Sequence, residues 1–288
     1  MLYDNFMKIS IITASYNYEK YIKETIQSIL NQTYKDWEMI IVDDCSTDNS
    51  VDVINSYNDE RIKLFVNKKN LGLKETLKSG IKEASSDWIV FLESDDVLAP
   101  DYLEKKVEII KKYHDINLIF NDCEFFGDDE RVKAFEHALK KTRDLLKNQS
   151  YPKNMFYNFY QSNKIFTFSS VMVKRNDLLK VNFNPKLDYL IDWHLWIQLA
   201  NSGKFYYMPE KLTKWRLHNN SYINSSTYKS PFDLQTASYL EVFKNKKDLS
   251  ILIFILLSHP VWYARKYKRE LRQKLISYKR KAFPKKKN

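Results

Sequence analysis

Short apolar runs alternate with helix-like segments through the first 120 residues, and this alternation constrains the fold more than any other feature. The helix-like segments carry apolar residues at helical spacing, as in residues 19–32 and 73–84. The apolar runs have the length of buried strands and cover residues 9–13, 38–42, 62–66, 88–92 and 118–120. This order predicts an α/β fold with a mostly parallel, Rossmann-like sheet and helices on both of its faces.

Polar residues follow three of the predicted strands. Thr13 and Tyr16 lie at the end of the first strand, and Asp44 follows the second. Asp95 and Asp96 follow the fourth. Because ligands bind at the carboxyl ends of parallel strands, we expect these side chains to gather at one edge of the sheet.

The acidic sequence Glu93-Ser94-Asp95-Asp96 is the strongest chemical signal in the chain. Adjacent carboxylates at a strand end supply the oxygen ligands that Mg²⁺ and Mn²⁺ prefer. An ion held there offsets the charge of a leaving diphosphate. The alternative is a polar loop that only caps the next helix. Asp44 is ambiguous in the same way, since its carboxylate can accept a bond from a nucleobase or cap a helix.

The second half of the chain has weaker patterning. Residues 127–149 are charged and aperiodic, and we predict a loop with some helix there. Residues 192–200 are predicted to be helical, because their apolar side chains form one stripe. Further segments are predicted as strands (166–173, 205–208 and 213–217) or helices (232–243 and 249–257).

The net charge of +11 is concentrated at the C-terminus. Residues 259–288 contain twelve Lys or Arg and one acid, so the rest of the chain is neutral. A neutral body argues against nucleic-acid binding. Aromatic and leucine side chains recur on one helical face of the tail, at Tyr263, Tyr267, Leu271, Leu275 and Tyr278. This pattern predicts a basic amphipathic helix on an anionic membrane surface, or alternatively a helix docked on its own domain.

Targeting signals are weak. The longest apolar run, residues 251–257, is shorter than the ~20 residues that a bilayer span needs. The first residues do not have the pattern of a signal peptide, and the two cysteines suit a reducing compartment. We therefore expect a cytoplasmic protein that attaches peripherally to the inner face of the cell membrane.

Two long segments match a known family. Residues 9–48 read ISIITASYNYEKYIKETIQSILNQTYKDWEMIIVDDCSTD, and residues 70–96 read NLGLKETLKSGIKEASSDWIVFLESDD. The chain resembles family 2 glycosyltransferases, which have the GT-A fold, a DxD-type metal motif and nucleotide-sugar donors. The resemblance is dense over about the first 120 residues and thinner to about Ser221.

The resemblance implies roles for the residues at the strand ends. Thr13 and Tyr16 line the base pocket, with Tyr16 stacking on the base. Asp44 bonds the base N–H and favours a uridine donor. Asp95 lies near the ribose and the metal, and Asp96 binds Mn²⁺ or Mg²⁺ and, through it, the diphosphate.

The sequence departs from the family pattern at two places. Glu93 stands where Asp is usual. Leu77 and Lys78 stand where Arg and Asn are common. Lys78 is a candidate replacement for the lost positive charge near the donor, and the alternative is a solvated lysine on a helix.

The resemblance also implies a catalytic base before a Trp-rich helix. Asp192, within the sequence LIDWHLW, fits this position, and a carboxylate there can take the proton of the acceptor hydroxyl. An N-cap is a compatible alternative for Asp192. His194 points away from it on a helix, and is read as structural or facing the acceptor. Arg216 and His218 resemble the family's late R-x-H segment and are candidates for contacts to the diphosphate and the metal.

These observations predict a GT-A domain over residues 1–225, with a donor-binding half (1–121) and an acceptor-binding half (122–225), and a helical basic extension over 226–288. The expected reaction is inverting, metal-dependent transfer from a nucleotide sugar, UDP-linked by preference, to a glycan or lipid-linked acceptor in bacterial surface polysaccharide or lipopolysaccharide synthesis. Two alternatives remain. One is a degenerate GT-A scaffold protein, and the other is a sugar nucleotidyltransferase, whose Gly-rich basic loop is missing from residues 14–18.

Overall fold

The computed structural model describes residues 7–159, 162–183 and 191–218, and six helical residues nearer the C-terminus. The chain divides into two compact units, Met1–Lys229 and Ser230–Asn288. In the second unit the rings of Tyr239 and Phe254 lie 5.8 Å apart. The basic helix predicted over residues 259–288 lies outside the described residues, as does most of the two helices predicted before it.

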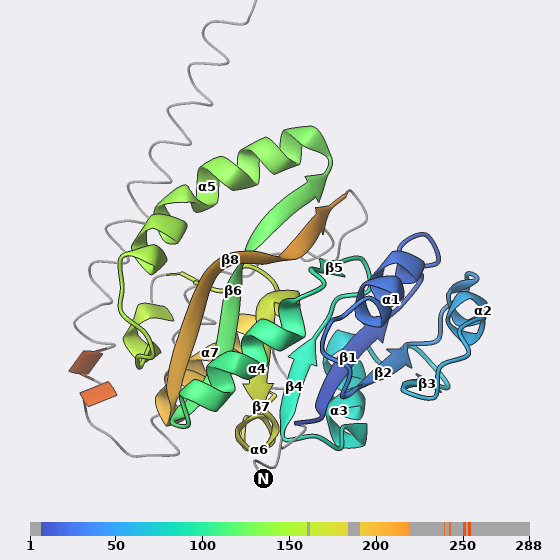
Figure 1. Ribbon diagram of the computed structural model, residues 1–288, viewed down its shortest axis with the longest axis horizontal. Coiled ribbons are helices and arrows are strands. Elements are labelled where there is room, and N and C mark those ends of the chain that lie inside the picture. Colours follow the sequence, from blue (N-terminus) through green and yellow to red (C-terminus); the bar gives the residue numbers. More distant parts are fainter. Residues whose placement is uncertain are drawn as a thin grey trace, which may run out of the picture. The chain divides into compact units, whose positions relative to one another are not determined.

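An eight-stranded sheet forms the centre of the first unit, in the order β3-β2-β1-β4-β7-β6-β8-β5 (Figure 1). In chain order the elements are β1 (Ile9–Ser15), α1 (Ile22–Leu30), β2 (Trp37–Asp43), α2 (Ser50–Asn55), β3 (Ile62–Val66), α3 (Leu73–Glu83), β4 (Trp88–Phe91), β5 (Val97–Leu98), α4 (Tyr102–Lys112), β6 (Ile116–Gly127), α5 (Asp129–Lys147), η1 (Phe156–Phe159), η2 (Phe168–Ser170), β7 (Val171–Lys174), α6 (Arg175–Leu178), α7 (Ile191–Ser202) and β8 (Lys204–Leu217).

Strand directions explain how one edge of this sheet becomes a binding edge. β1 pairs in parallel with β2 and β4, and β2 pairs in parallel with β3. β7 is antiparallel to both β4 and β6, and β8 runs parallel to β6. The carboxyl ends of β1, β2 and β4, and that of β8 further along the sheet, therefore lie toward the same edge.

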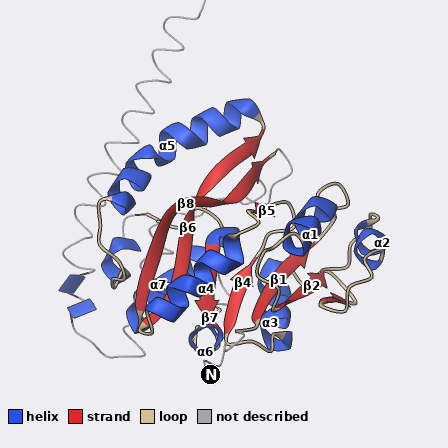
Figure 2. Cartoon of the chain, in the orientation of Figure 1, coloured by secondary structure: helices blue, strands red, loops and turns tan. Residues whose placement is uncertain are grey.

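Alternating side chains bury both faces of the sheet. Ile9 and Ile11 of β1 belong to a core cluster with residues of α1 and α4. The next residue of β1, Ile12, faces the other side, where α3 packs so closely that a Cβ on Gly80 would lie 2.5 Å from Ile12 Cγ2. Figure 2 shows the resulting layers, with helices on both sides of the strands. The predicted fold class is confirmed.

Three local predictions were wrong. Residues 129–147 form one continuous helix, α5, whose Phe135 packs against Phe125 and Trp215 and whose Arg143 bonds Asp122. The stretch predicted as a strand over 166–173 is a 3₁₀ turn, η2, followed by the short β7. Residues 204–217 form a single strand that pairs with β6 through register shifts, instead of two strands.

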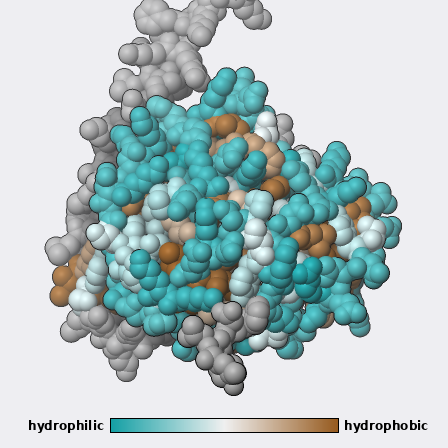
Figure 3. Space-filling model, in the orientation of Figure 1, coloured by the Kyte–Doolittle hydropathy of each residue, from teal (hydrophilic) through white to brown (hydrophobic). Residues whose placement is uncertain are grey.

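The face of the molecule that is drawn in Figure 3 is mostly polar over the described residues. Hydrophilic side chains dominate the face seen in Figure 3, with small apolar patches between them. Among the residues that the structure describes, no helix combines the length and apolar character that a membrane span requires.

Candidate active site

The acidic loop lies between β4 and β5, at the carboxyl end of β4. The Asp96 amide donates to the Glu93 carbonyl at 3.2 Å, which closes a turn around Ser94 and Asp95. Ser94 Oγ donates to the Ala14 carbonyl at the end of β1, at 3.2 Å. The turn is therefore fixed both internally and to the neighbouring strand.

The partly exposed Glu93 and the fully buried Asp96 meet at the hydroxyl of Thr167. Asp96 has no exposed surface, and its Oδ1 accepts from the Arg216 amide at 2.9 Å. The hydroxyl of Thr167 donates to Glu93 Oε2 and lies 3.2 Å from Asp96 Oδ2. Burial, followed by the charge of Asp95, raises the pKa of Glu93 to about 8 and that of Asp96 well above its usual range. Burial and mutual repulsion therefore both oppose ionisation of this pair.

Asp95 is the acid of the loop that contacts the residues after β8. Its side chain is 9% exposed, and its Oδ2 lies 2.8 Å from His218 Nε2 just beyond β8. The His218 ring stacks at a tilt on Tyr21, with 4.8 Å between centroids, and meets Tyr18 edge-on at 6.3 Å. Burial and the charges of Asp95, Glu93 and Asp96 raise the pKa of Tyr18, so its phenol stays neutral beside these acids.

Arg216 joins the end of β8 to the acidic loop and to α1. Its Nε donates to the Asp95 carbonyl at 2.8 Å, and its Nη2 pairs with Glu24. The guanidinium lies between two rings, 4.9 Å from the centroid of Tyr21 and 4.2 Å from that of Phe126. Arg216 thus braces the loop in addition to any role toward a ligand.

Asp192 lies in the first turn of α7. Its Oδ2 accepts from Asn163 Nδ2 at 2.6 Å. Burial raises its pKa to about 6. Its charge in turn raises the pKa of Glu93, so Asp192 lies near the acidic loop. His194 is buried and bonds the Asn182 carbonyl at 2.9 Å, which agrees with the structural reading of this residue.

The ends of β1 and β2 lie beside this cluster. Thr13 is fully buried, and its Oγ1 has no hydrogen-bond partner among the residues that the structure describes. Tyr16 is 43% exposed. Asp44 does not cap α2, because its carboxylate accepts from Asn67 Nδ2 and from the amides of Leu71 and Gly72 at 2.7–2.8 Å. Asp44 therefore organises the loop before α3.

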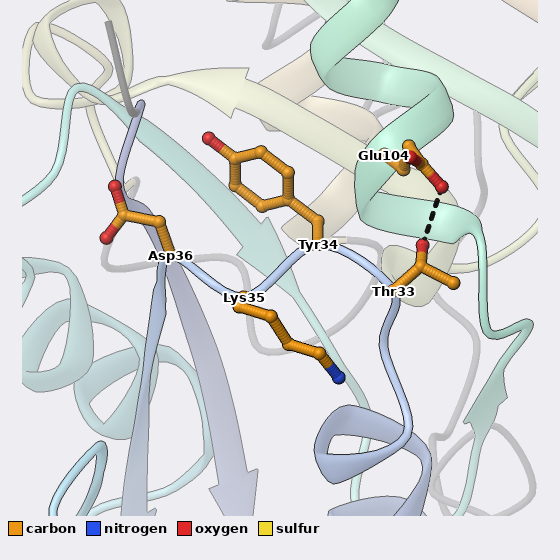
Figure 4. Close-up of a pocket in the computed structure, with 5 residues that line it drawn as sticks. All are labelled: Thr33, Tyr34, Lys35, Asp36 and Glu104. Carbon is orange, nitrogen blue, oxygen red and sulfur yellow. Dashed lines mark hydrogen bonds between the residues drawn. The ribbon is translucent and has the colours of Figure 1, made fainter. Parts of the chain in front are cut away.

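One predicted site residue is held elsewhere. The Lys78 ammonium pairs with Glu75 at 2.9 Å on α3, where both side chains are nearly half exposed, as in the solvated alternative. A surface pocket also lies away from the cluster, at the segment that enters β2 (Figure 4). Thr33, Tyr34, Lys35, Asp36 and Glu104 line it, and Thr33 Oγ1 donates to Glu104 at 2.7 Å. This is the amino end of the strand, opposite to the edge where α/β proteins bind ligands.

Several neighbours of the site were not predicted. Thr167 and Asn163 hold the acids from a segment about 70 and 30 residues away in sequence, and no motif marks them. Tyr18 and Tyr21 lie next to the SYN sequence, so the cluster of tyrosines there was a usable signal. Glu24, in the first turn of α1, pairs with Arg216. In the sequence it has only the pattern of an exposed helix residue, so no motif marks it.

Asp95 and His218 are the protein groups that fit a divalent ion. Carboxylate oxygen suits Mn²⁺ or Mg²⁺, and an imidazole nitrogen beside it favours the transition-metal ion Mn²⁺. Mg²⁺ is commonly held by one or two protein carboxylates together with substrate phosphates. Among the described residues no three His, Cys, Asp or Glu side chains form a closed metal cage. The pair therefore fits an ion shared with a diphosphate better than a metal site built by the protein alone.

Comparison with known proteins adds independent information. The family model for glycosyl transferase family 2 matches residues 10–178. TuaG of Bacillus subtilis, a glycosyltransferase whose name assigns it to teichuronic acid biosynthesis, is 32% identical over 77% of this chain and 83% of its own length. WfgD of Escherichia coli, a UDP-Glc:alpha-D-GlcNAc-diphosphoundecaprenol beta-1,3-glucosyltransferase, is 36% identical over 49% of this chain and 55% of its own.

Solved structures share the fold. TarS of S. aureus in complex with UDP-GlcNAc superimposes with a TM-score of 0.63 at 20% identity, over 82% of this chain and 67% of TarS. The mannosyltransferase PcManGT of Pyrobaculum calidifontis, in complex with GDP-Man and Mn²⁺, gives a TM-score of 0.57 at 14% identity, over 91% and 82% of the two chains. The chain therefore belongs to glycosyl transferase family 2 and is a glycosyltransferase of the GT-A fold.

Proposed function

We propose that this glycosyltransferase moves a sugar from a UDP-sugar to a glycan or lipid-linked acceptor, with inversion at the anomeric carbon and with Mn²⁺ or Mg²⁺. The observation that carries the proposal is the Asp95–His218 pair, 2.8 Å apart, with the half-buried Asp192 close to the same loop. A group that neutralises a leaving diphosphate and a base for the acceptor are the two requirements of a single displacement.

The donor base is assigned to the ends of β1 and β2. Tyr16 offers an exposed ring for stacking, and Thr13 offers a buried hydroxyl without a partner among the described residues. Asp44 holds the loop 67–72 and still has lone pairs for a base N–H. The UDP-linked donors in the names of WfgD and of the TarS complex support uridine.

The metal is assigned to Asp95 and His218. We place Asp96, which the sequence suggested as the main ligand, behind them, because its two oxygens are bonded to Arg216 and Thr167 and are fully buried. When bound, the ion would offset the charge that develops on the leaving diphosphate. Arg216 braces the loop and lies close enough to Asp95 to meet a donor oxygen as well. Lys78 is left out of the site because it pairs with Glu75.

Asp192 is assigned as the base. Its pKa of about 6 leaves the carboxylate mostly ionised at neutral pH while keeping it basic enough to accept a proton from the acceptor hydroxyl. Asn163 donates to Oδ2 and so holds the carboxylate in one orientation.

The acceptor and setting rest on the relatives. WfgD acts, by its name, on a diphosphoundecaprenol-linked sugar, and TuaG belongs, by its name, to teichuronic acid biosynthesis. Both support synthesis of a bacterial surface polysaccharide on a lipid carrier. The basic residues of 259–288 would then hold the enzyme on anionic lipid at the inner face of the cell membrane.

A thermal-shift screen tests the donor and metal assignments together. UDP, GDP, ADP and CDP are each added with and without Mn²⁺, because a ligand that binds only the folded protein raises its melting temperature. We expect the largest rise with UDP and Mn²⁺, and a release of UDP from UDP-sugars under the same conditions. An equal response to all four nucleotides, unchanged by Mn²⁺, contradicts the proposal.

A further inference from the structure

We infer that Thr167 is a positioning residue for the transfer reaction: its hydroxyl ties Glu93 to Asp96 and so fixes Asp95 as the carboxylate that faces the donor diphosphate. The inference rests on the proposed function, since it names a residue that acts through Asp95. Thr167 precedes η2 and comes from a part of the chain that no site motif includes.

The contacts of one hydroxyl carry this inference. Thr167 Oγ1 donates to Glu93 Oε2 and lies 3.2 Å from Asp96 Oδ2, and Thr167 is only 4% exposed. Glu93 and Asp96 are the two ends of the turn whose tip is Ser94 and Asp95, closed by the bond from the Asp96 amide to the Glu93 carbonyl. Because Thr167 engages the side chains at both ends of the turn, Asp95, which contacts His218 instead, is the acid of the turn that is left to meet the donor.

The turn that carries Thr167 is itself held from two sides. Ser169 Oγ accepts from the Glu93 amide at 2.9 Å, which joins η2 directly to the acidic loop. On the other side the buried Lys106 donates its ammonium to the Ser170 carbonyl at 2.6 Å. Thr167 also caps η2, because its Oγ1 accepts from the Ser169 amide at 3.3 Å. The hydroxyl therefore has little freedom to move away from the acids.

This arrangement accounts for Glu93, the residue that departs from the family pattern. A glutamate carries its carboxylate one methylene further than an aspartate, about 1.5 Å. In this chain the extra length brings Oε2 to the Thr167 hydroxyl. Glu93 and Thr167 thus form a matched pair, and shortening either partner should loosen the loop.

The test uses the full-length chain with UDP and Mn²⁺ as probes. Thr167→Val removes the hydroxyl at nearly constant size, and Thr167→Ser restores it. The matched control is Ser170→Ala, because Ser170 Oγ, in the same turn, donates to the Thr167 carbonyl at 2.8 Å and, within the described part of the chain, to neither acid. The readouts are the Mn²⁺ concentration that half-saturates the UDP-dependent thermal shift, and kcat with KM for the donor.

Loss of a group that orients a metal ligand costs about 10–100-fold in metal affinity or activity. We therefore expect Thr167→Val to raise the half-saturating Mn²⁺ concentration about tenfold and to lower kcat more than it changes KM, while Thr167→Ser and Ser170→Ala stay within about twofold of wild type. An unchanged Mn²⁺ requirement in Thr167→Val, with a wild type that shows the thermal shift, overturns the inference alone. A wild type without any Mn²⁺-dependent shift overturns the proposed function and the inference with it. If Thr167→Ser or Ser170→Ala loses as much Mn²⁺ affinity and activity as Thr167→Val, the turn has only a structural role, and the inference is overturned.

Discussion

Replacing Asp192 with Asn should stop sugar transfer while leaving the folded protein at least as stable. The substitution keeps the size of the side chain and an oxygen that can accept the Asn163 bond, which measures 2.6 Å in the wild type. It removes the negative charge and the basicity. A positioned general base contributes about 10²–10⁴-fold to a rate, so kcat should fall by that factor while donor binding is kept.

The raised pKa of Asp192 fixes the sign of the stability change. Because burial raises the folded-state pKa from 3.8 to about 6, the ionised side chain destabilises the fold progressively as the pH rises from about 4 through 6. The full shift corresponds to at most about 3 kcal/mol, and partial exposure reduces this to the order of 1 kcal/mol. Asp192→Asn should therefore melt about 2–4 °C higher than wild type at pH 7.5, and the difference should vanish near pH 4.

The assay measures nucleotide release and product formation between pH 5 and 9, with melting curves at each pH. In the wild type kcat/KM should fall about tenfold per pH unit below about 6. Asp177→Asn on α6 is the control, because its partner is the exposed Lys180 at 3.2 Å. The base assignment is wrong if Asp192→Asn transfers sugar near the wild-type rate. If its activity and melting temperature fall together, Asp192 only supports the helix.

Three further results are expected. Asp95→Asn should weaken the Mn²⁺-dependent thermal shift with UDP at least tenfold, because the carboxylate paired with His218 is lost, whereas Asp101→Asn, in an exposed pair with Lys105, should leave it unchanged. Glu38→Gln should lower the free energy of unfolding at pH 7 by about 2–3 kcal/mol. Although burial opposes ionisation, the bonds from Ser85, Lys63 and Ser10 lower the pKa of Glu38 from 4.5 to about 2, and this stability is lost as the pH falls through 2. The gap to wild type in urea titrations should therefore shrink by more than half at pH 3, and a constant gap would point to packing instead. Gly80→Ala should destabilise the protein by about 1–2 kcal/mol, since overpacking against Ile12 exceeds the gain in helix propensity, and a more stable variant would refute the close approach of α3 to β1.

Local patterns predicted most of the donor-binding half. Apolar runs and helical spacing located β1, β2, β3 and β4 to within a few residues. Both faces of β1, β2 and β4 are buried, and the edge strand β3 pairs with β2, its neighbour in sequence. The same reasoning missed α5, whose apolar face is defined by Phe125 and Trp215 on β6 and β8. A sparse apolar pattern becomes a helix there only because two distant strands supply a surface for it.

The sequence alone determined which chemistry-bearing residues this chain possesses, and its family resemblance predicts that Asp95, Asp96, Asp192, Arg216 and His218 belong to one site. Tertiary structure decided which contacts each of these side chains makes and how deeply each is buried. Asp95 meets His218 across 123 residues of sequence, and Asp96 is withdrawn by Thr167 and Arg216, which are 71 and 120 residues away. Burial, hydrogen bonding and pKa depend on atoms brought together by folding, and no spacing within a motif records them.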